Sequence, residues 1–111
     1  MMIQRLAVVL SENAISDLET IGAYILENSG SENIANDFAD RIKARCESIG
    51  NAPRGGRSCD DIEPGLRTVP FEHSAVIAYV IENDAVLIIN IFYGGRDYEA
   101  LMRDGGSGDP S

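Results

Sequence analysis

Arginines bracket a long apolar stretch in the second half of the chain, and they are its first candidates for chemistry. Arg67 precedes the stretch, and Tyr93 and Arg96 follow it. Strands that only build a core need no arginine at their ends, so these side chains predict a working surface. A guanidinium is a fixed cation with several hydrogen-bond donors, which suits contact with a phosphate or an acidic target. It is a poor general base because it stays protonated.

Two further arginines, Arg54 and Arg57, lie in a Gly- and Pro-rich stretch, but acidic residues follow them closely. The whole chain carries a net charge of −9. Proteins that grip nucleic acid present clustered positive charge, since phosphate contacts supply most of the affinity. Folding can segregate a local basic patch, but the overall field repels RNA and DNA. The charge therefore counts against a nuclease and against direct DNA binding.

The length of 111 residues predicts one domain over residues 1–103 with a single core. Residues 104–111 are rich in Gly, Ser and Pro, which predicts a disordered tail. No apolar run approaches the roughly 20 residues of a membrane helix, and the first ten residues lack the features of a secretory signal. We therefore expect a cytoplasmic protein that does not contact membranes.

Too few potential ligands are present to predict a metal site. Cys46 and Cys59 lack a second cysteine pair, and His73 is the single histidine. We expect two reduced thiols, with Cys46 on the apolar face of a helix, and a surface position for His73 beside a turn. The acidic residues after Arg57 are expected to form a solvated loop. No metal and no cofactor is predicted.

Periodicity predicts two helices after a first short strand at 6–10. Ser11 can cap the first helix, whose apolar positions recur at helical spacing, and Asn28-Ser29-Gly30 ends it. The second helix begins near Ser31 and ends at Gly50. The predicted apolar positions are Ile15, Leu18, Ile21, Gly22, Ile25 and Leu26 in the first helix, and Ile34, Ala35, Phe38, Ala39, Ile42, Cys46 and Ile49 in the second.

Three strands are predicted after an irregular loop at 50–65. They begin at Arg67, Ala75 and Ala85, and Asn83-Asp84 forms the turn between the last two. A short helical stub follows Asp97. The order β-α-α-β-β-β, with that C-terminal helix, favours an α+β fold in which a two-helix hairpin packs on a small antiparallel β-sheet.

The order and spacing of several short motifs resemble the ParE/RelE superfamily of small bacterial toxins, which includes plasmid stabilisation proteins. The resemblance covers about residues 3–102. Each motif is common alone, and their combination is the specific feature. They are Asp17-Leu18, Tyr24-Ile25, Pro53 with Gly55, Gly65-Leu66-Arg67, Tyr79-Val80-Ile81, Ile89-Asn90-Ile91 and Tyr93-Gly94-Gly95-Arg96-Asp97.

The resemblance implies the toxin of a type II toxin–antitoxin pair, held inactive by a ParD-like antitoxin. RelE-like members cut messenger RNA on the ribosome, whereas ParE-like members poison DNA gyrase without a catalytic site. Arg67 matches the phosphate-binding arginine of the cutting branch, and Tyr93 stands where that branch carries a general acid or base. However, Arg67 also occurs in ParE-like members, and an aromatic residue at a strand end commonly packs. Cutters often place lysines in the loop that here holds arginines.

The sequence therefore predicts a ParE-like toxin that inhibits DNA gyrase by binding and is neutralised by a cognate antitoxin. No catalytic residue is expected. Candidates for contact with the target or with phosphate are Arg54, Arg57, Arg67, Tyr93 and Arg96. Two alternatives stay open. One is a RelE-like, metal-independent endoribonuclease that uses Arg67 and Tyr93, and the other is a degenerate, non-toxic member that binds an antitoxin.

Overall fold

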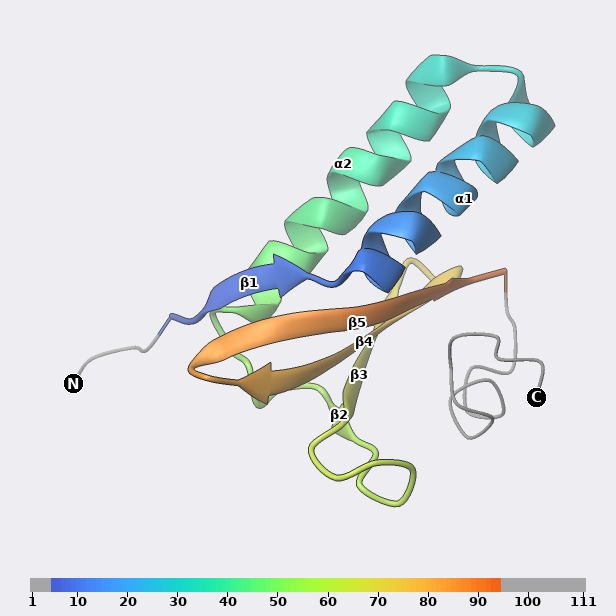
Figure 1. Ribbon diagram of the computed structural model, residues 1–111. Helices are drawn as coiled ribbons and strands as arrows, with labels where there is room; N and C mark the ends of the chain where they lie inside the picture. Colours follow the sequence, from blue (N-terminus) through green and yellow to red (C-terminus); the bar gives the residue numbers. More distant parts are fainter. Residues whose placement is uncertain (1–4, 95–111) are drawn as a thin grey trace.

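The computed structural model describes residues 5–94, which form a helical hairpin on one face of a five-stranded sheet (Figure 1). The elements are β1 (Ala7–Leu10), α1 (Glu12–Ser29), α2 (Glu32–Ile49), β2 (Arg57–Ser58), β3 (Arg67–Phe71), β4 (Ala75–Glu82) and β5 (Ala85–Tyr93). The sheet order is β1-β5-β4-β3-β2. The predicted α+β class is thereby confirmed. Arg96, the C-terminal stub and the tail lie outside the described residues.

The sheet is mixed rather than wholly antiparallel, which corrects one part of the prediction. Strands β2 to β5 pair antiparallel, but β1 runs parallel to β5, with Ala7 opposite Ala85 and Leu10 opposite Ile88. The two helices carry the chain away and back between β1 and the other strands, so the direction of β1 is not set by a hairpin turn. The predicted loop also contains a short strand, β2, which pairs with β3.

Serine caps set both helix starts: Ser11, which the sequence predicts as a cap, and Ser31, near which the sequence predicts the start of the second helix. The Ser11 side chain accepts a hydrogen bond from the backbone N–H of Ala14, and Ser31 accepts one from Ile34. Ser11 also binds the sheet, because its N–H and its hydroxyl donate to the carbonyls of Ile88 and Ile89. The first helix therefore starts at a fixed point on β5.

The stripe that α1 buries is narrower than the predicted one. Its buried positions are Ala14, Ile21 and Ile25, and Asp17, Leu18 and Gly22 are half-buried. Exposed instead are Ile15, Leu26 and, in α2, Ile34. Each helix touches the sheet and one neighbour, so a single narrow face of each is covered. The predicted core positions Phe38, Ile42, Cys46 and Ile49 of α2 are buried.

A smaller apolar cluster lies on the opposite face of the sheet. Cys59 and Leu66 pack there against Ala78 and Phe92, so the segment between β2 and β3 folds back over the strands. The carboxylate of Asp60 fastens this segment by accepting hydrogen bonds from the Gly65 N–H and the Ser58 hydroxyl, which hold its pKa below the usual value.

The turns of the two hairpins agree with expectation at two points. Asn83 and Asp84 both have positive φ, as a two-residue hairpin turn requires. His73 is exposed beside the β3–β4 turn. Within residues 5–94, neither helix is long and apolar enough to cross a membrane.

The buried, free thiol of Cys46 predicts a loss of stability in alkali. Burial raises the pKa of this thiol from 9.0 to about 11. The unfolded chain therefore loses the proton at lower pH than the folded one, and the free energy of unfolding falls as pH rises from about 9 to about 11. Urea unfolding at pH 8, 9, 10 and 11 measures this slope. In Cys46→Ala the slope should become shallower, and an unchanged slope would contradict the assignment.

Candidate functional site

The loop that carries Arg54 is held by two side chains from the sheet. The Tyr79 hydroxyl donates to the carbonyl of Pro53 at 2.8 Å and accepts from the N–H of Gly56 at 3.1 Å. Nη1 of Arg67 donates to the carbonyls of Arg54 and Gly56, at 3.1 and 2.9 Å. Together, Tyr79 and Arg67 form what we call the loop clasp.

Strand register explains how the loop clasp forms. Arg67 on β3 lies directly opposite Tyr79 on β4, and cross-strand partners place their side chains on the same face of a sheet. Tyr79 is fully buried, and burial raises the pKa of its phenol. A side chain at Gly56 would collide with the Tyr79 hydroxyl, so glycine is required for this close approach.

Two of the predicted arginines, Arg54 and Arg67, lie together at this end of the sheet, and Arg57 lies on the neighbouring strand. Arg54 lies in the clasped loop. Arg57 pairs with Thr68, the neighbour of Arg67, so its side chain lies on the opposite face of the sheet from that of Arg67. The exposed Arg54 side chain lines a cavity of about 380 Å³ together with Leu6, Ala52, Pro53, Gly55, Ile81 and Asp84. Arg54 and Arg67 are therefore neighbours in an acidic chain, but the guanidinium of Arg67 is engaged in backbone contacts.

Tyr93 lies elsewhere, so the structure does not bring together the two residues that an RNA-cutting mechanism would use. Tyr93 is opposite Ala75, whereas Arg67 is opposite Tyr79, four residues along the same strand. At the rise of a strand this offset is about 13 Å, and the two residues also lie on opposite sides of β4. A general acid must lie within hydrogen-bond reach of the group that it protonates. At this separation, Arg67 and Tyr93 could not both contact the same phosphate.

The Tyr93 ring belongs to an aromatic cluster between the sheet and the helices. It packs edge-on against Tyr24 of α1 and Phe38 of α2, with ring centroids 5.7 and 5.5 Å apart. Phe38 in turn packs against Phe71 at 5.4 Å. The expectation that this aromatic residue packs at a strand end agrees with the geometry.

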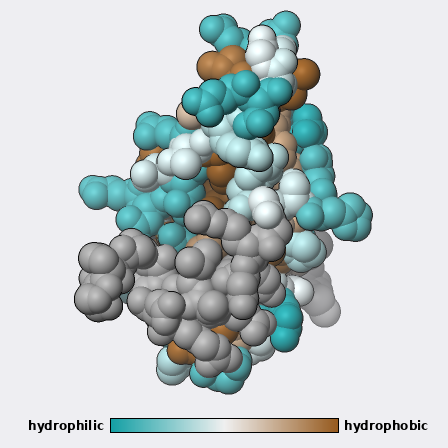
Figure 2. Space-filling model, turned by 90° about the vertical axis from the view of Figure 1, so that its right-hand side faces the viewer, coloured by the Kyte–Doolittle hydropathy of each residue, from teal (hydrophilic) through white to brown (hydrophobic). Residues whose placement is uncertain are grey.

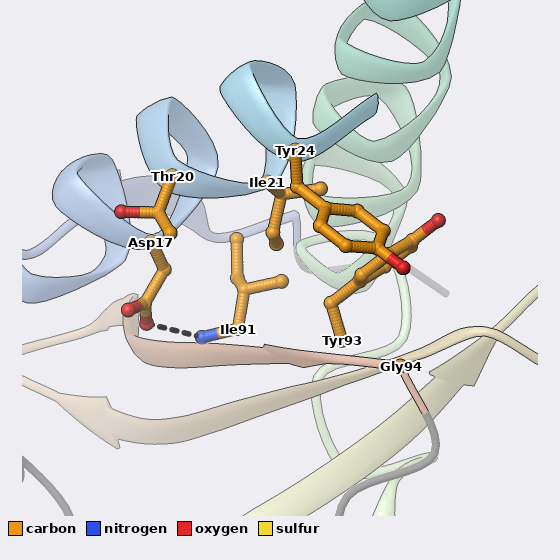
Figure 3. Close-up of a pocket in the computed structure, with 7 residues that line it drawn as sticks. All are labelled: Asp17, Thr20, Ile21, Tyr24, Ile91, Tyr93 and Gly94. Carbon is orange, nitrogen blue, oxygen red and sulfur yellow. Dashed lines mark hydrogen bonds between the residues drawn. The ribbon is translucent and has the colours of Figure 1, made fainter. Parts of the chain in front are cut away.

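Beside Tyr93, α1 and the end of β5 enclose a pocket of about 320 Å³ (Figure 3). Tyr24 and Tyr93 form one end, and Asp17 forms the other. Oδ2 of Asp17 accepts a hydrogen bond from the backbone N–H of Ile91 at 2.9 Å and another from the side-chain Nδ2 of Asn90 at 3.2 Å. These bonds follow a β-bulge in which Ile89 is the extra residue of β5.

A third, shallower hollow of about 460 Å³ lies on the outer side of the helical hairpin, and small residues such as Gly22 and Ala39 line it. In Figure 2, the helical hairpin lies in the upper part of the view, and its surface is mostly polar with apolar patches. Tyr24 and Ile34 are each 53% exposed. Among residues 5–94, no group of acidic, histidine or cysteine side chains is arranged to hold a metal ion.

Sequence reasoning missed the roles of Tyr79 and Asp17, although both residues carried a signal. Tyr79 is the one hydroxyl-bearing side chain within the aliphatic β4, and a buried tyrosine normally finds a partner for its hydroxyl. Asp17 is an acid beside a stripe of apolar helix positions. Neither signal identifies the partner, because both partners lie far away in the sequence.

We predict that Tyr79→Phe destabilises the fold by about 1–2 kcal/mol, because the Pro53 carbonyl and Gly56 N–H lose their buried partner. Amide hydrogen exchange at Gly56 should accelerate accordingly. Arg54→Ala is the matched control, since it alters the same loop but removes an exposed side chain, and it should change stability by less than about 0.5 kcal/mol. Equal effects of the two substitutions would contradict the loop clasp.

Comparison with known proteins agrees with this architecture. Residues 8–98 match the family model described as the ParE toxin of type II toxin–antitoxin system, parDE. The fold is similar to a solved chain of the chromosomal ParDE toxin–antitoxin system from P. aeruginosa, with a TM-score of 0.70 and 18% identity over 82% of this chain and 98% of the other. No significant match is found among curated proteins. The family model spans most of the chain, which therefore belongs to the ParE toxin family of type II toxin–antitoxin systems.

Proposed function

We propose that this toxin acts by binding DNA gyrase and inhibiting it, without catalysis of its own, and that a cognate ParD-like antitoxin neutralises it. The proposed place of action is the cytoplasm, and no cofactor or direct DNA contact is required. Family membership supports the toxin role, and the resemblance of the sequence to the gyrase-binding branch supports the target.

The separation of Arg67 from Tyr93 is the observation that carries the non-catalytic mechanism. Cleavage of RNA needs a base, an acid and clustered cations around a single phosphate. Here the guanidinium of Arg67 supports a loop, and the Tyr93 ring packs with Tyr24 and Phe38 at the far end of the strands. A binding mechanism needs neither residue to act on a proton.

The antitoxin partner is supported by the surface that the fold leaves uncovered. Two exposed apolar side chains of α1 line hollows large enough for partner side chains: Tyr24 lines the pocket beside Tyr93, and Leu26 lines the hollow on the outer side of the helical hairpin. Exposed apolar surface beside grooves commonly marks a protein interface. The net charge of −9 favours a basic partner surface, which would steer association.

A ribosome-dependent endoribonuclease is the second candidate, because Arg54 and Arg67 lie together at one end of the sheet, with Arg57 on the neighbouring strand. It would place phosphate on Arg54 and Arg67 and would require a proton donor near them. Arg96 stays a contact candidate in both proposals.

Expression of the chain from a tightly controlled promoter distinguishes the two candidates. With gyrase as target, thymidine incorporation should fall first and cells should form filaments, while methionine incorporation persists. Early arrest of translation with cleaved messages would support the endoribonuclease instead. Unimpaired growth would contradict both toxic mechanisms and favour the non-toxic, antitoxin-binding alternative.

Tyr93→Phe supplies a sharper comparison in the same assay. The substitution removes the hydroxyl and retains the ring that packs against Tyr24 and Phe38. Growth inhibition should stay within about twofold of the unaltered chain, whereas loss of a general acid costs about 100-fold or more in rate. Thermal unfolding of the variant controls for loss of fold, and loss of toxicity in a stable variant would contradict the proposal.

A further inference from the structure

The pocket between α1 and the end of β5 combines a carboxylate, an apolar floor and an aromatic wall. In Figure 3, Ile21 and Ile91 point toward one another between Asp17 at one end and the Tyr24–Tyr93 pair at the other. Asp17 and Tyr24 are seven residues apart on one helix, which separates them by about 10 Å along its axis. The pocket is therefore an elongated slot with one negatively charged end.

One oxygen of Asp17 is still available to a ligand. Both of its hydrogen bonds, from Ile91 and Asn90, reach Oδ2, and within residues 5–94 its Oδ1 has no hydrogen-bond partner. The Asp17 side chain is fixed by these bonds but remains half-buried rather than enclosed. A carboxylate held in place beside apolar walls binds a cation without first losing much side-chain freedom.

The charge of Asp17, the one charged residue among the described residues that line the slot, selects the sign of its occupant, and the rest of its helix adds no positive charge. Helix α1 carries four acidic residues and no basic one: Glu12, Asp17, Glu19 and Glu27. An acidic ligand would be repelled, and a purely apolar one would cover the Asp17 carboxylate without supplying a partner, which is unfavourable. A short polar side chain could not span the apolar floor.

We propose that this slot receives one long basic side chain, arginine or lysine, from an extended segment of the antitoxin, a partner that rests on the function proposed above. The cationic head binds Oδ1 of Asp17, and the methylenes lie along Ile21 and Ile91. The partner backbone then passes the rings of Tyr24 and Tyr93. Long basic side chains favour this arrangement because their stems pack on apolar surface while the charge stays in contact with water.

The test is an NMR titration of the full chain with Nα-acetyl-arginine methylamide as the probe. The Ile91 amide is the reporter, since its N–H donates to Asp17. The Ile91 and Tyr93 signals should move with the arginine probe and move much less with the norleucine analogue, which lacks the charge. Equal shifts with both probes, or no shift at Ile91, would overturn the proposal.

Two variants with the same loss of charge sharpen the titration. Asp17→Asn keeps an oxygen that can accept from Ile91 but removes the charge, and it should weaken the arginine probe by about fivefold or more. Glu19→Gln is the matched control, because Glu19 lies on the same helix but lines the hollow on the outer side of the helical hairpin. It should change affinity by less than about twofold. Similar losses of affinity in both variants would show that the probe responds only to the overall negative charge, which would overturn the proposal that it binds in the slot.

Failure of the slot and failure of the proposed function give different results. If the probe does not bind at Ile91 while expression of the chain still stops DNA synthesis, the gyrase-directed function is supported and the proposal for the slot is rejected. If the probe binds as expected while the chain has no effect on growth, the slot stands as a cation-binding site and the toxin proposal falls.

Discussion

The register between β3 and β4 is the constraint on which the account of this toxin depends. It places Arg67 opposite Tyr79, so that the guanidinium of Arg67 and the hydroxyl of Tyr79 reach one loop and form hydrogen bonds with its backbone. A buried tyrosine hydroxyl without a partner would be costly, and an unsupported loop would leave Arg54 without a fixed position. The same register sets Arg67 about 13 Å along β4 from the position opposite Tyr93. One geometric fact therefore assigns a structural use to the arginine and separates it from the tyrosine.

At the interface between α1 and β5, polar side chains likewise bind the backbone of a neighbouring segment. Strand β1 pairs with β5 only as far as Ile88, and beyond it the side chains of Ser11 and Asp17 bind the backbone at Ile89 and Ile91. Polar side chains of the helix thus cover an edge that would otherwise invite another strand. Asp17 stabilises the fold through one oxygen and leaves the other without a hydrogen-bond partner among residues 5–94, so structural support and recognition can use the same carboxylate.

Local signals allowed much of the fold to be predicted. Ser11 and Ser31 cap helices because a serine oxygen satisfies a free N–H, and Asn83-Asp84 tolerates the positive φ of a hairpin turn. The parallel pairing of β1 and the exposure of Ile15 and Ile34 were missed, because they depend on which neighbour covers each face. The site shows the same limit. Arg54 and Arg67 could be named as contact candidates from their residue type, whereas the loop clasp joins residues 11 to 26 positions apart and leaves no periodic pattern in the sequence.

The distinction between binding and catalysis is tested most directly with purified components. DNA gyrase would be assayed for supercoiling of relaxed plasmid in the presence of increasing amounts of the purified toxin, with the Tyr93→Phe protein alongside. The account predicts that both proteins inhibit supercoiling at similar concentrations, because a binder needs no proton donor at this position. Undiminished supercoiling, together with cleavage of messenger RNA on purified ribosomes by the unaltered protein but not by Tyr93→Phe, would contradict it.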